Sequence, residues 1–383
     1  MKEGWEYKKL GEVCETASGG TPSKSHAEYY KGGTIPWLRS GEVSQGYIYD
    51  SELYITEVGM KNSSAKLFPI NTVVIAMYGA TVGQVGLLKR EMTTNQAICG
   101  IFPNKFLYPT FLMFSLKAKK SIFLKDAVGG AQPNISQNIV KNTSIPIPTL
   151  EEQQQIVSEL DLLSGVIEKH KAQLEELDKL AQSIFYDMFG DPVTNERGWR
   201  KSSIEEISVL RSGNSEANNS MPGKLPYVKV GDMNIEGNEF YIKTSSTFID
   251  KESNLKDIFP IGTTIFPKRG GAILTNKKRL TKLEICCDLN VMGVIPKKEL
   301  IDPLYLYFYF LRIDFKIFAK TGSAIPQINN YNIAPMSIGL PPLSLQQEFA
   351  AKVEAIEAMK AKVRQSLKEA ETLFNERMDY YFN

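Results

Sequence analysis

The segment LEEQQQIVSELDLLSGVIEKHKAQLEELDKLAQSIFYDMF (150–189) determines how the rest of the chain is organised. Its apolar residues recur at alternating steps of four and three, the seven-residue repeat of a coiled-coil seam. The seam positions are Ile156, Leu160, Leu163, Ile167, Leu174, Leu177, Ala181, Ile184 and Met188. Only His170 interrupts the series. At about 1.5 Å of rise per residue, the pattern predicts a helical rod on the order of 60 Å long, which could act as a spacer.

The same pattern occurs a second time, in residues 343–382. Its seam positions are Phe349, Val353, Ile356, Val363, Leu367, Ala370, Phe374 and Tyr381. The lead-in is repeated too, because IPIPTLEEQQQI (145–156) matches IGLPPLSLQQEF (338–349) and places Gln153 over Gln346. We therefore expect two long helices of similar construction.

The segments between the rods are also duplicated, in the same order and at offsets of 190 to 194 residues. The matching pairs include GWEYKKLGEV (4–13) with GWRKSSIEEI (198–207), IPWLRSGEV (35–43) with LPYVKVGDM (225–233), FPINTVVIAMYG (68–79) with FPIGTTIFPKRG (259–270), and GAQPNIS (130–136) with SAIPQIN (323–329). A period this long indicates two domains, since solenoid repeats are far shorter. Each copy is a globular block followed by a long helix.

The composition of each block predicts a mixed α+β fold. Runs of β-branched and aromatic residues between Gly, Pro and Asn predict strands at residues 72–77, 98–102, 263–266 and 291–295. Residues 109–117 and 303–313 open with proline and are typical of helices, because proline is tolerated in the first turn. The predicted organisation is a first domain at 1–149, a central helix at 150–194, a second domain at 195–342 and a C-terminal helix at 343–383.

The net charge of +2 conceals an uneven distribution. Residues 1–149 hold 16 Lys and Arg against 11 Asp and Glu, and residues 195–342 hold 20 against 15. The first rod holds 3 against 10, and the second holds 6 against 7. If the protein meets a polyanion, the two blocks should therefore contact it. Solvated faces on an ordinary protein explain the charge equally well.

Several kinds of catalytic site lack the residues they need. The chain has only two histidines, His26 and His170, so a Ser–His–Asp or Cys–His site has almost no candidates. The segment GGAILTNKKR (270–279) lacks the spacing of a phosphate-binding loop, and no GxGxxG fingerprint is present. We expect no metal site and no enzyme that acts alone.

The sequence also predicts the compartment. The cysteines show no metal-type spacing and are typical of a reduced cytosolic protein; they are Cys14, Cys99, Cys286 and Cys287. No signal peptide opens the chain, and the longest apolar run, residues 304–311, is too short to span a bilayer. A cytoplasmic protein without membrane contact is expected.

Polar loops beside glycines carry the side chains that a nucleic-acid surface would use. Phosphates are contacted by Lys and Arg, guanine by Arg, and adenine by Asn or Gln. The candidates in the first block are Ser18, Thr21, Lys24, Arg39, Gln84, Asn95, Gln96, Gln132 and Asn134. Those in the second are Lys229, Lys268, Arg269, Asn276, Lys277, Lys278, Arg279, Gln327 and Asn329. The basic group Lys277–Lys278–Arg279 is the strongest candidate.

The chain resembles the specificity subunit of type I restriction–modification enzymes along essentially its whole length. The matching pieces are SGGTPS (18–23), YYKGGTIPWLRSGEV (29–43), TNQAI (94–98), QPNIS (132–136) and IPIPTLEEQQQI (145–156), with their degenerate second copies and both long helices. The second copy has RSGNSEAN (211–218) in place of SGGTPS, so only the framework is shared there.

The resemblance implies two target recognition domains, each of which reads one half of a bipartite site in double-stranded DNA. The long helices would pair antiparallel, giving an internal pseudo-twofold repeat, and their length would set the spacer. Two methyltransferase subunits would bring S-adenosylmethionine, and motor–nuclease subunits would bring ATP hydrolysis with Mg²⁺, while this chain would bind no cofactor. The residues expected in the coiled coil and in partner docking are Gln153, Ile156, Leu160, Leu163, Ile167, His170, Leu174, Gln346, Phe349, Val353, Val363 and Leu367.

Two alternatives stay open at this point. A coiled-coil spacer that displays two protein- or glycan-binding domains would explain the rods and the duplication. It would not explain the excess of basic residues in each block or the amide-rich loops. A single-chain endonuclease is the other alternative, and it would cleave DNA with metal alone.

Overall fold

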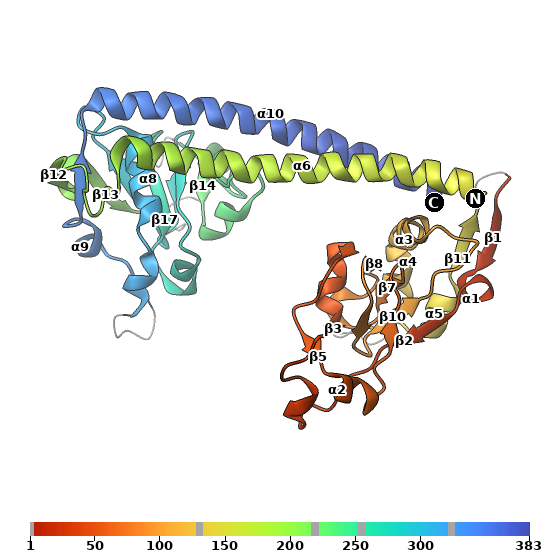
Figure 1. The fold of residues 1–383 in the computed structure, drawn as a ribbon. Helices are drawn as coiled ribbons and strands as arrows, with labels where there is room; N and C mark the ends of the chain where they lie inside the picture. The colour runs from red at the N-terminus through yellow and green to blue at the C-terminus, as the bar shows by residue number, and fades with distance from the viewer. Residues whose placement is uncertain (1–3, 128–132, 216–221, 252–257, 321–325) are drawn as a thin grey trace. The chain divides into compact units, whose positions relative to one another are not determined.

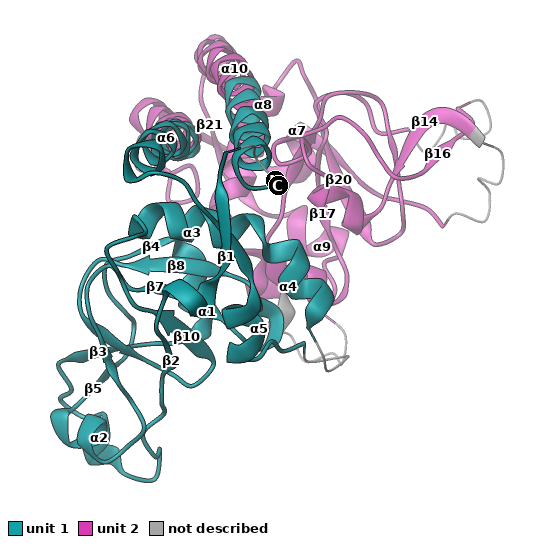
Figure 2. Ribbon diagram, turned by 90° about the vertical axis from the view of Figure 1, so that its right-hand side faces the viewer, with its two compact units in different colours: residues 1–171, 365–383 teal, residues 172–364 magenta. Residues whose placement is uncertain are grey.

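The computed structural model describes residues 4–127, 133–215, 222–251, 258–320 and 326–383 (Figure 1). Two compact units are formed, Met1–Lys171 with Gln365–Asn383, and Ala172–Arg364 (Figure 2). Both long helices, α6 (Leu150–Phe189) and α10 (Leu343–Phe382), are divided between the units. Each unit therefore holds one globular domain and one segment of each helix, whereas the four-part division by residue ranges stays a prediction.

The first unit is built from short strands and helices. Its strands are β1 (Glu6–Lys9), β2 (Thr16–Ser18), β3 (Ile35–Leu38), β4 (Tyr47–Ile48), β5 (Tyr54–Ile55), β6 (Leu67–Phe68), β7 (Val73–Ala76), β8 (Val85–Leu88), β9 (Met92–Thr94), β10 (Ile98–Ile101) and β11 (Ser144–Ile147). Its α-helices besides α6 and α10 are α1 (Leu10–Val13), α2 (Glu57–Lys61), α3 (Pro109–Ala118), α4 (Lys120–Asp126) and α5 (Gln137–Asn142). The strands form a five-stranded sheet in the order β2-β10-β7-β8-β4, a four-stranded sheet β5-β3-β9-β6, and the pair β1-β11.

The second unit repeats this plan. Its strands are β12 (Arg200–Ser203), β13 (Ser208–Ser212), β14 (Pro222–Val228), β15 (Tyr241–Ile242), β16 (Phe248–Ile249), β17 (Thr264–Pro267), β18 (Arg279–Thr281), β19 (Cys286–Cys287), β20 (Val291–Pro296) and β21 (Ser337–Leu340). Its further helices are α7 (Ile204–Ile207), α8 (Pro303–Arg312) and α9 (Asn330–Ile333). The order β13-β20-β17-β18-β15 reproduces the five-stranded sheet of the first unit, and β12-β21 and β16-β14-β19 complete the set.

A glycine in β10 and its counterpart in β20, the second strand of each five-stranded sheet, shows how closely the copies agree. A Cβ on Gly100 would lie 2.4 Å from the ring of Phe68, and a Cβ on Gly293 would lie 2.5 Å from the ring of Phe259. Both phenylalanines are buried. In each copy, therefore, an aromatic ring lies directly on the backbone of this strand, which leaves no room for any side chain at the glycine.

One helix fills the space between each five-stranded sheet and the long helices. Residues 110–116 of α3 and 304–310 of α8 are all buried. In the first unit the core around α3 includes Leu160 of α6 and Phe382 of α10. In the second, Phe185 of α6 and Phe349 of α10 lie in the core around α8. The helix segments are thus part of the core of each unit.

Within each unit the two helix segments run antiparallel. In the first unit Arg377 donates to Glu159 (2.9 Å), and Lys171 pairs with Glu371 (3.6 Å). In the second, the Lys360 ammonium lies 2.6 Å from the Asp178 carboxylate.

The strands and helices predicted for the blocks are confirmed within one or two residues at each end. The central helix ends at Phe189 and does not continue to residue 194, because Gly190 adopts a left-handed φ of +69° and Pro192 follows. No helix among the described residues is long and apolar enough to cross a membrane.

Candidate nucleic-acid interface

The candidate residues of the first unit gather at one end of the five-stranded sheet. β10 is antiparallel to both β2 and β7, so the last residues of β2 and β7 lie beside the first residue of β10. The loops that leave this end contain the predicted side chains Ser18, Thr21, Gln84, Asn95, Gln96 and Asn134. Sequence segments that are far apart are therefore brought together at one edge, as a composite binding surface requires.

Hydrogen bonds connect these loops. The Gly20 amide donates to the Thr94 carbonyl (2.9 Å), and the Gly79 amide donates to the Pro133 carbonyl (2.9 Å). The Thr21 hydroxyl donates to the amide oxygen of Gln96. The Trp37 indole, which is buried, donates to the Gly20 carbonyl (2.9 Å) and fixes the glycine turn. The surface is thus ordered by its own backbone.

The second unit builds the same sheet end from different side chains. β20 lies between β13 and β17, so Ser212 and Lys268 come close together, and the Lys268 ammonium donates to the Ser212 hydroxyl (2.6 Å). The Gly270 amide donates to the Pro326 carbonyl (2.8 Å), the counterpart of the Gly79 bond. Gln327 donates from its side chain to Asn329 (2.7 Å).

Lys268 and Lys278 are buried and are not surface cations, which argues against phosphate contacts, and their role in DNA binding stays a prediction. Lys268, which directly follows β17 and donates to Ser212 of β13, is buried. Lys278 is 1% exposed, donates to Asn276 and to the Ile313 carbonyl (2.6 Å each), and lies 4.3 Å from the centre of the Phe315 ring. Burial lowers the pKa of Lys278 to about 8. This lysine stabilises the junction between the β18 region and the end of α8.

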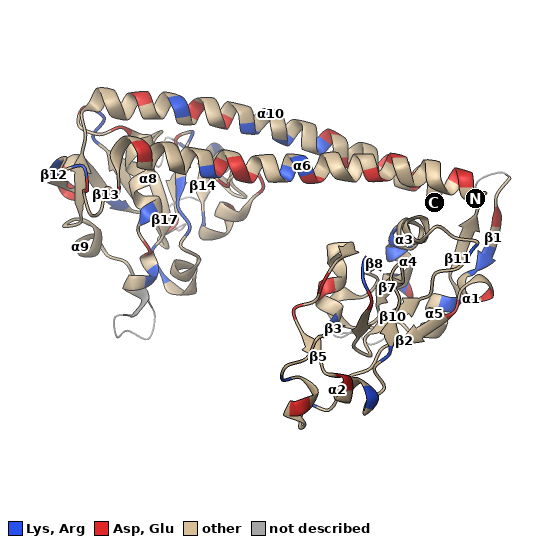
Figure 3. Cartoon of the chain, viewed as in Figure 1, with Lys and Arg blue, Asp and Glu red and all other residues tan. Residues whose placement is uncertain are grey.

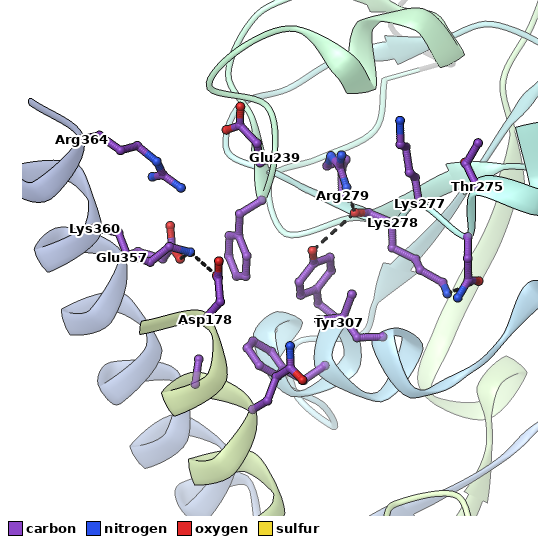
Figure 4. Close-up of a pocket in the computed structure, with 16 residues that line it drawn as sticks. Asp178, Glu239, Thr275, Lys277, Lys278, Arg279, Tyr307, Glu357, Lys360 and Arg364 are labelled. Atoms are coloured by element: carbon purple, nitrogen blue, oxygen red, sulfur yellow. Dashed lines mark hydrogen bonds and ion pairs between the residues drawn. The ribbon is translucent and has the colours of Figure 1, made fainter. Parts of the chain in front are cut away.

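Arg279 is also used internally. Its guanidinium donates to the carbonyls of Lys278 (2.8 Å) and Met233 (3.0 Å), and burial lowers its pKa. Figure 4 shows Arg279 and Tyr307 at one side of a pocket of about 290 Å³, with Lys360 at the other. The predicted cationic group therefore reduces to Lys277, whose ammonium donates to Asn234 at an exposed place.

The remaining candidates differ in whether their side chains are exposed to solvent and whether they are paired with other residues. Lys24 is exposed, whereas the exposed Arg39 is paired with Glu42 and Glu52. Lys229 is half-buried and lies 5.7 Å from the centre of the Tyr227 ring. Gln132 lies outside the described residues. Figure 3 shows Lys and Arg spread through both domains and acidic residues along α6.

A buried carboxylate that sequence reasoning missed lies behind Arg39 and its counterpart Lys229. Glu42 accepts hydrogen bonds from the Arg39 amide (3.0 Å) and the Ser51 hydroxyl (3.1 Å). Asp232 accepts from the Lys229 amide (2.8 Å) and from the Ser245 hydroxyl (3.0 Å). Burial opposes ionisation of Asp232, but these donors and Ser246 hold its pKa below the usual value. The signal was the alignment of SGEV (40–43) with VGDM (230–233), which keeps one acid in both copies.

The helix seam is confirmed for most of its predicted positions. Ile156, Leu160, Ile167, Phe349, Val353 and Val363 are buried, and Leu163, Leu174 and Leu367 are half-buried. His170 is half-buried, and its Nδ1 is buried without a hydrogen-bond partner in the described part of the chain. Lys360, which the apolar pattern skipped, also lies in the seam and is 3% exposed.

Gln153 and Gln346 cannot contact a partner through their side chains, because both are fully buried. Gln153 accepts from the Tyr108 amide (2.7 Å) and donates to the carbonyls of Phe106 and Pro148 (3.0 Å each). Gln346 accepts from the Asp302 amide and donates to the Pro341 carbonyl (2.8 Å each). Docking by the segments that contain them stays a prediction, while each side chain ties the start of a long helix to the segment before α3 or α8.

The titratable side chains give little indication of catalysis. No group of three or more His, Cys, Asp or Glu suited to a metal ion occurs among the residues that the structure describes. The four cysteines are buried free thiols, and burial raises the pKa of Cys14 to about 11 and that of Cys99 to about 12. Thiols with raised pKa values are poor nucleophiles at neutral pH.

Comparison with known proteins gives a consistent result. A family model described as "Type I restriction modification DNA specificity domain" matches residues 2–179 and 196–371. The type I restriction enzyme MjaIX specificity subunit of Methanocaldococcus jannaschii is 29% identical over 381 residues, which covers 92% of this chain and 86% of the relative. The EcoR124I/EcoR124II specificity subunit of Escherichia coli is 33% identical over 167 residues, or 42% of this chain and 41% of the relative.

The fold matches solved structures as well. The S subunit of a type I restriction–modification system from M. genitalium has a TM-score of 0.61 at 15% identity, covering 100% of this chain and 98% of that one. A second structure, reported for complex assembly and conformational transition of the type I R-M system, has a TM-score of 0.61 at 20% identity. At these identities the likeness shows the fold alone. The predicted fold class, two α+β domains and two long antiparallel helices, is confirmed.

Proposed function

Because the chain belongs to the family of type I restriction–modification DNA specificity domains, we propose that it is the DNA-reading subunit of such a system. Each unit reads one half of a bipartite site in double-stranded DNA, and the long helices fix the separation of the two half-sites. The comparisons favour this function over a spacer that displays protein- or glycan-binding domains.

One observation supports the proposal most directly. The same sheet end occurs in both units, with the same backbone bonds at Gly79 and Gly270 but with different side chains around them. A shared scaffold with different exposed side chains is what two readers of unlike half-sites need, because specificity lies in the side chains that reach base edges. Two catalytic sites would instead need the same reactive groups twice.

The partners follow from the same premise. Two methyltransferase subunits would supply S-adenosylmethionine and methylate adenine, which has to leave the base stack. Motor–nuclease subunits would supply ATP hydrolysis and cleavage with Mg²⁺, and this chain would bind none of these cofactors. We place the protein in the cytoplasm, and four buried free thiols are consistent with a reducing compartment.

Methylome sequencing of cells that express a matching methyltransferase subunit, with and without this chain, tests the proposal. We expect methyladenine at a bipartite motif only when the chain is present. Assembly with a competent methyltransferase but no bipartite motif would contradict it.

An insertion of one helical turn at corresponding places in α6 and α10 should lengthen the spacer and leave both half-sites unchanged. Modification at the original spacing alone would contradict the spacing role of the helices.

A further inference from the structure

Tyr78 and Arg269 occupy the same backbone position in the two units. They are the penultimate residues of the matching segments FPINTVVIAMYG (68–79) and FPIGTTIFPKRG (259–270), and each precedes a glycine with a left-handed φ. Tyr78 forms a β-bridge with Asn134, and Arg269 forms the corresponding bridge with Gln327. The two side chains therefore leave the sheet end from equivalent points, each beside an amide side chain.

The backbone on both sides of Arg269 is fixed. The Gly270 amide donates to the Pro326 carbonyl (2.8 Å), and the Ile328 amide donates to the Lys268 carbonyl (2.8 Å). In the first unit the Gly79 amide bonds to Pro133 and the Ile135 amide bonds to Met77 (2.9 Å each). Each side chain thus leaves a short strand pair that is held by two backbone hydrogen bonds. Such a fixed backbone suits a side chain that must reach a defined atom of a base.

Arg269 differs from the other cations near this sheet end in being available. Lys268 is tied to Ser212, and Arg211 donates to the Ile258 carbonyl (2.7 Å). Arg269 is exposed, and its guanidinium has no hydrogen bond or ion pair with any residue in the described ranges. Tyr78, at the same point of the first unit, is 46% exposed.

From this placement we infer that Arg269 reads a guanine in the half-site of the second unit, and that Tyr78 and Asn134 occupy the corresponding place in the first. A guanidinium fork matches the O6 and N7 acceptors of guanine, whereas an asparagine amide matches adenine. A phosphate contact explains the pair less well. Tyrosine and arginine can both donate to phosphate oxygens, but such contacts carry no sequence information, whereas this position differs between the copies, as readers of unlike half-sites would. The inference rests on the proposed function.

The test selects bound sequences from a library randomised in both half-sites, using the chain assembled with its methyltransferase subunits. Arg269→Gln should reduce the preference for guanine at one position of one half-site by about fivefold to 150-fold, since a good bidentate contact discriminates by about 1–3 kcal/mol. Tyr78→Arg should create a guanine preference at one position of the other half-site. Arg200→Gln, an exposed arginine on β12, is the matched control and should leave the motif unchanged.

The possible results separate this inference from the proposed function. If the wild-type complex selects no bipartite motif, the proposed function is overturned, and the inference with it. If it selects a motif but Arg269→Gln weakens all sequences equally and lowers the salt slope of binding by about 0.9, Arg269 contacts phosphate and only the inference is overturned. A motif that is unchanged in both variants would also overturn the inference alone.

Discussion

Ile167 in the first unit and Lys360 in the second occupy the same place in the duplicated helices, 193 residues apart. Both are buried, but only Lys360 needs charged partners. Its ammonium lies 2.6 Å from Asp178 and 2.5 Å from Glu357. It also lies 5.7 Å from the centre of the Phe240 ring. The comparison shows that one helix position can hold an apolar residue or a cation, provided that the charge is compensated locally.

Gln153 and Gln346 show the opposite behaviour, because the same residue is used in both copies. Each satisfies backbone groups at a point where a chain segment turns into the next helix. An apolar side chain could fill the space but could not replace those bonds. The residue type that satisfies backbone groups, glutamine at 153 and 346, is therefore the same in both copies. The residue type at the seam position of Ile167 and Lys360 differs between them.

The largest effect should come from removing these glutamines. Gln153→Leu leaves one amide and two carbonyls unpaired, so the free energy of unfolding should fall by about 3 kcal/mol. Gln346→Leu leaves one amide and one carbonyl, so about 2 kcal/mol should be lost. Urea denaturation measures both. The exposed neighbours Gln154→Leu and Gln347→Leu are controls, and equal losses in all four variants would contradict the assignment.

A somewhat smaller effect is expected at Lys360. Lys360→Ile gives the second unit the residue of the first but leaves the Glu357 carboxylate, which is 14% exposed, without its cation. Stability should fall by about 2 kcal/mol. Adding Glu357→Ser, the counterpart of Ser164, should restore most of the loss. A double-mutant cycle in urea measures the coupling, and additive effects would show that the pair does not interact.

Tyr47 and Tyr241 occupy corresponding positions, and removing their hydroxyls should change the free energy of unfolding by about 1 kcal/mol at most. The Tyr47 hydroxyl donates to Asp161 on α6 (2.5 Å), and burial raises the Tyr47 pKa. In the second unit Tyr241 faces Glu354 in the corresponding place, without a hydrogen bond among the described residues. Tyr47→Phe should therefore lower the free energy of unfolding by about 1 kcal/mol, and Tyr241→Phe should lower it by much less. Thermal unfolding curves of the two variants measure both changes. The reverse order would contradict this account.

The smallest effect is expected at Lys277, which is compared with its neighbour Lys278. Lys277→Ala should weaken DNA binding a few-fold for all sequences and lower the salt slope by about 0.9, as loss of one phosphate contact would. Lys278→Ala should instead lower thermal stability, because the Lys278 ammonium is bonded inside the unit. Titration of labelled DNA at several salt concentrations, together with melting curves, distinguishes the two lysines. Loss of DNA binding at unchanged stability in Lys278→Ala would contradict its internal role.

Most of the architecture could be predicted without coordinates. The seam of 150–189 and its repeat at 343–382 gave both helices their starting residues, and the duplicated FPI segments gave β7 and β17. Local periodicity suffices for this, because burial on one face of a helix leaves a regular pattern in the sequence. The end of the helical pattern at Phe189 could also be read from the sequence, because Gly190 and Pro192 follow it, although the range assigned to the central helix ran on to residue 194.

The site was predicted less well. Several candidate loops lie together at one sheet end, and their role in DNA binding stays a prediction, but charge alone could not show which cations are exposed. Lys277 and Lys278 are adjacent and chemically identical, yet Lys277 is half-buried and bonded to Asn234, whereas Lys278 is buried on the Phe315 ring. Glu42 and Asp232 were overlooked for the same reason, because a buried carboxylate looks like any acid in the sequence.

The sequence by itself determined the duplication, the two long helices, the α+β domains and the family, because each leaves a periodic or repeated signal along the chain. Only the tertiary structure decided which side chains are free to bind. It buried Lys268, Lys278, Gln153 and Gln346, and it left Arg269 exposed opposite Gln327. The physical reason is that exposure and hydrogen bonding depend on segments 35 to 56 residues away, and these contacts leave no local pattern in the sequence.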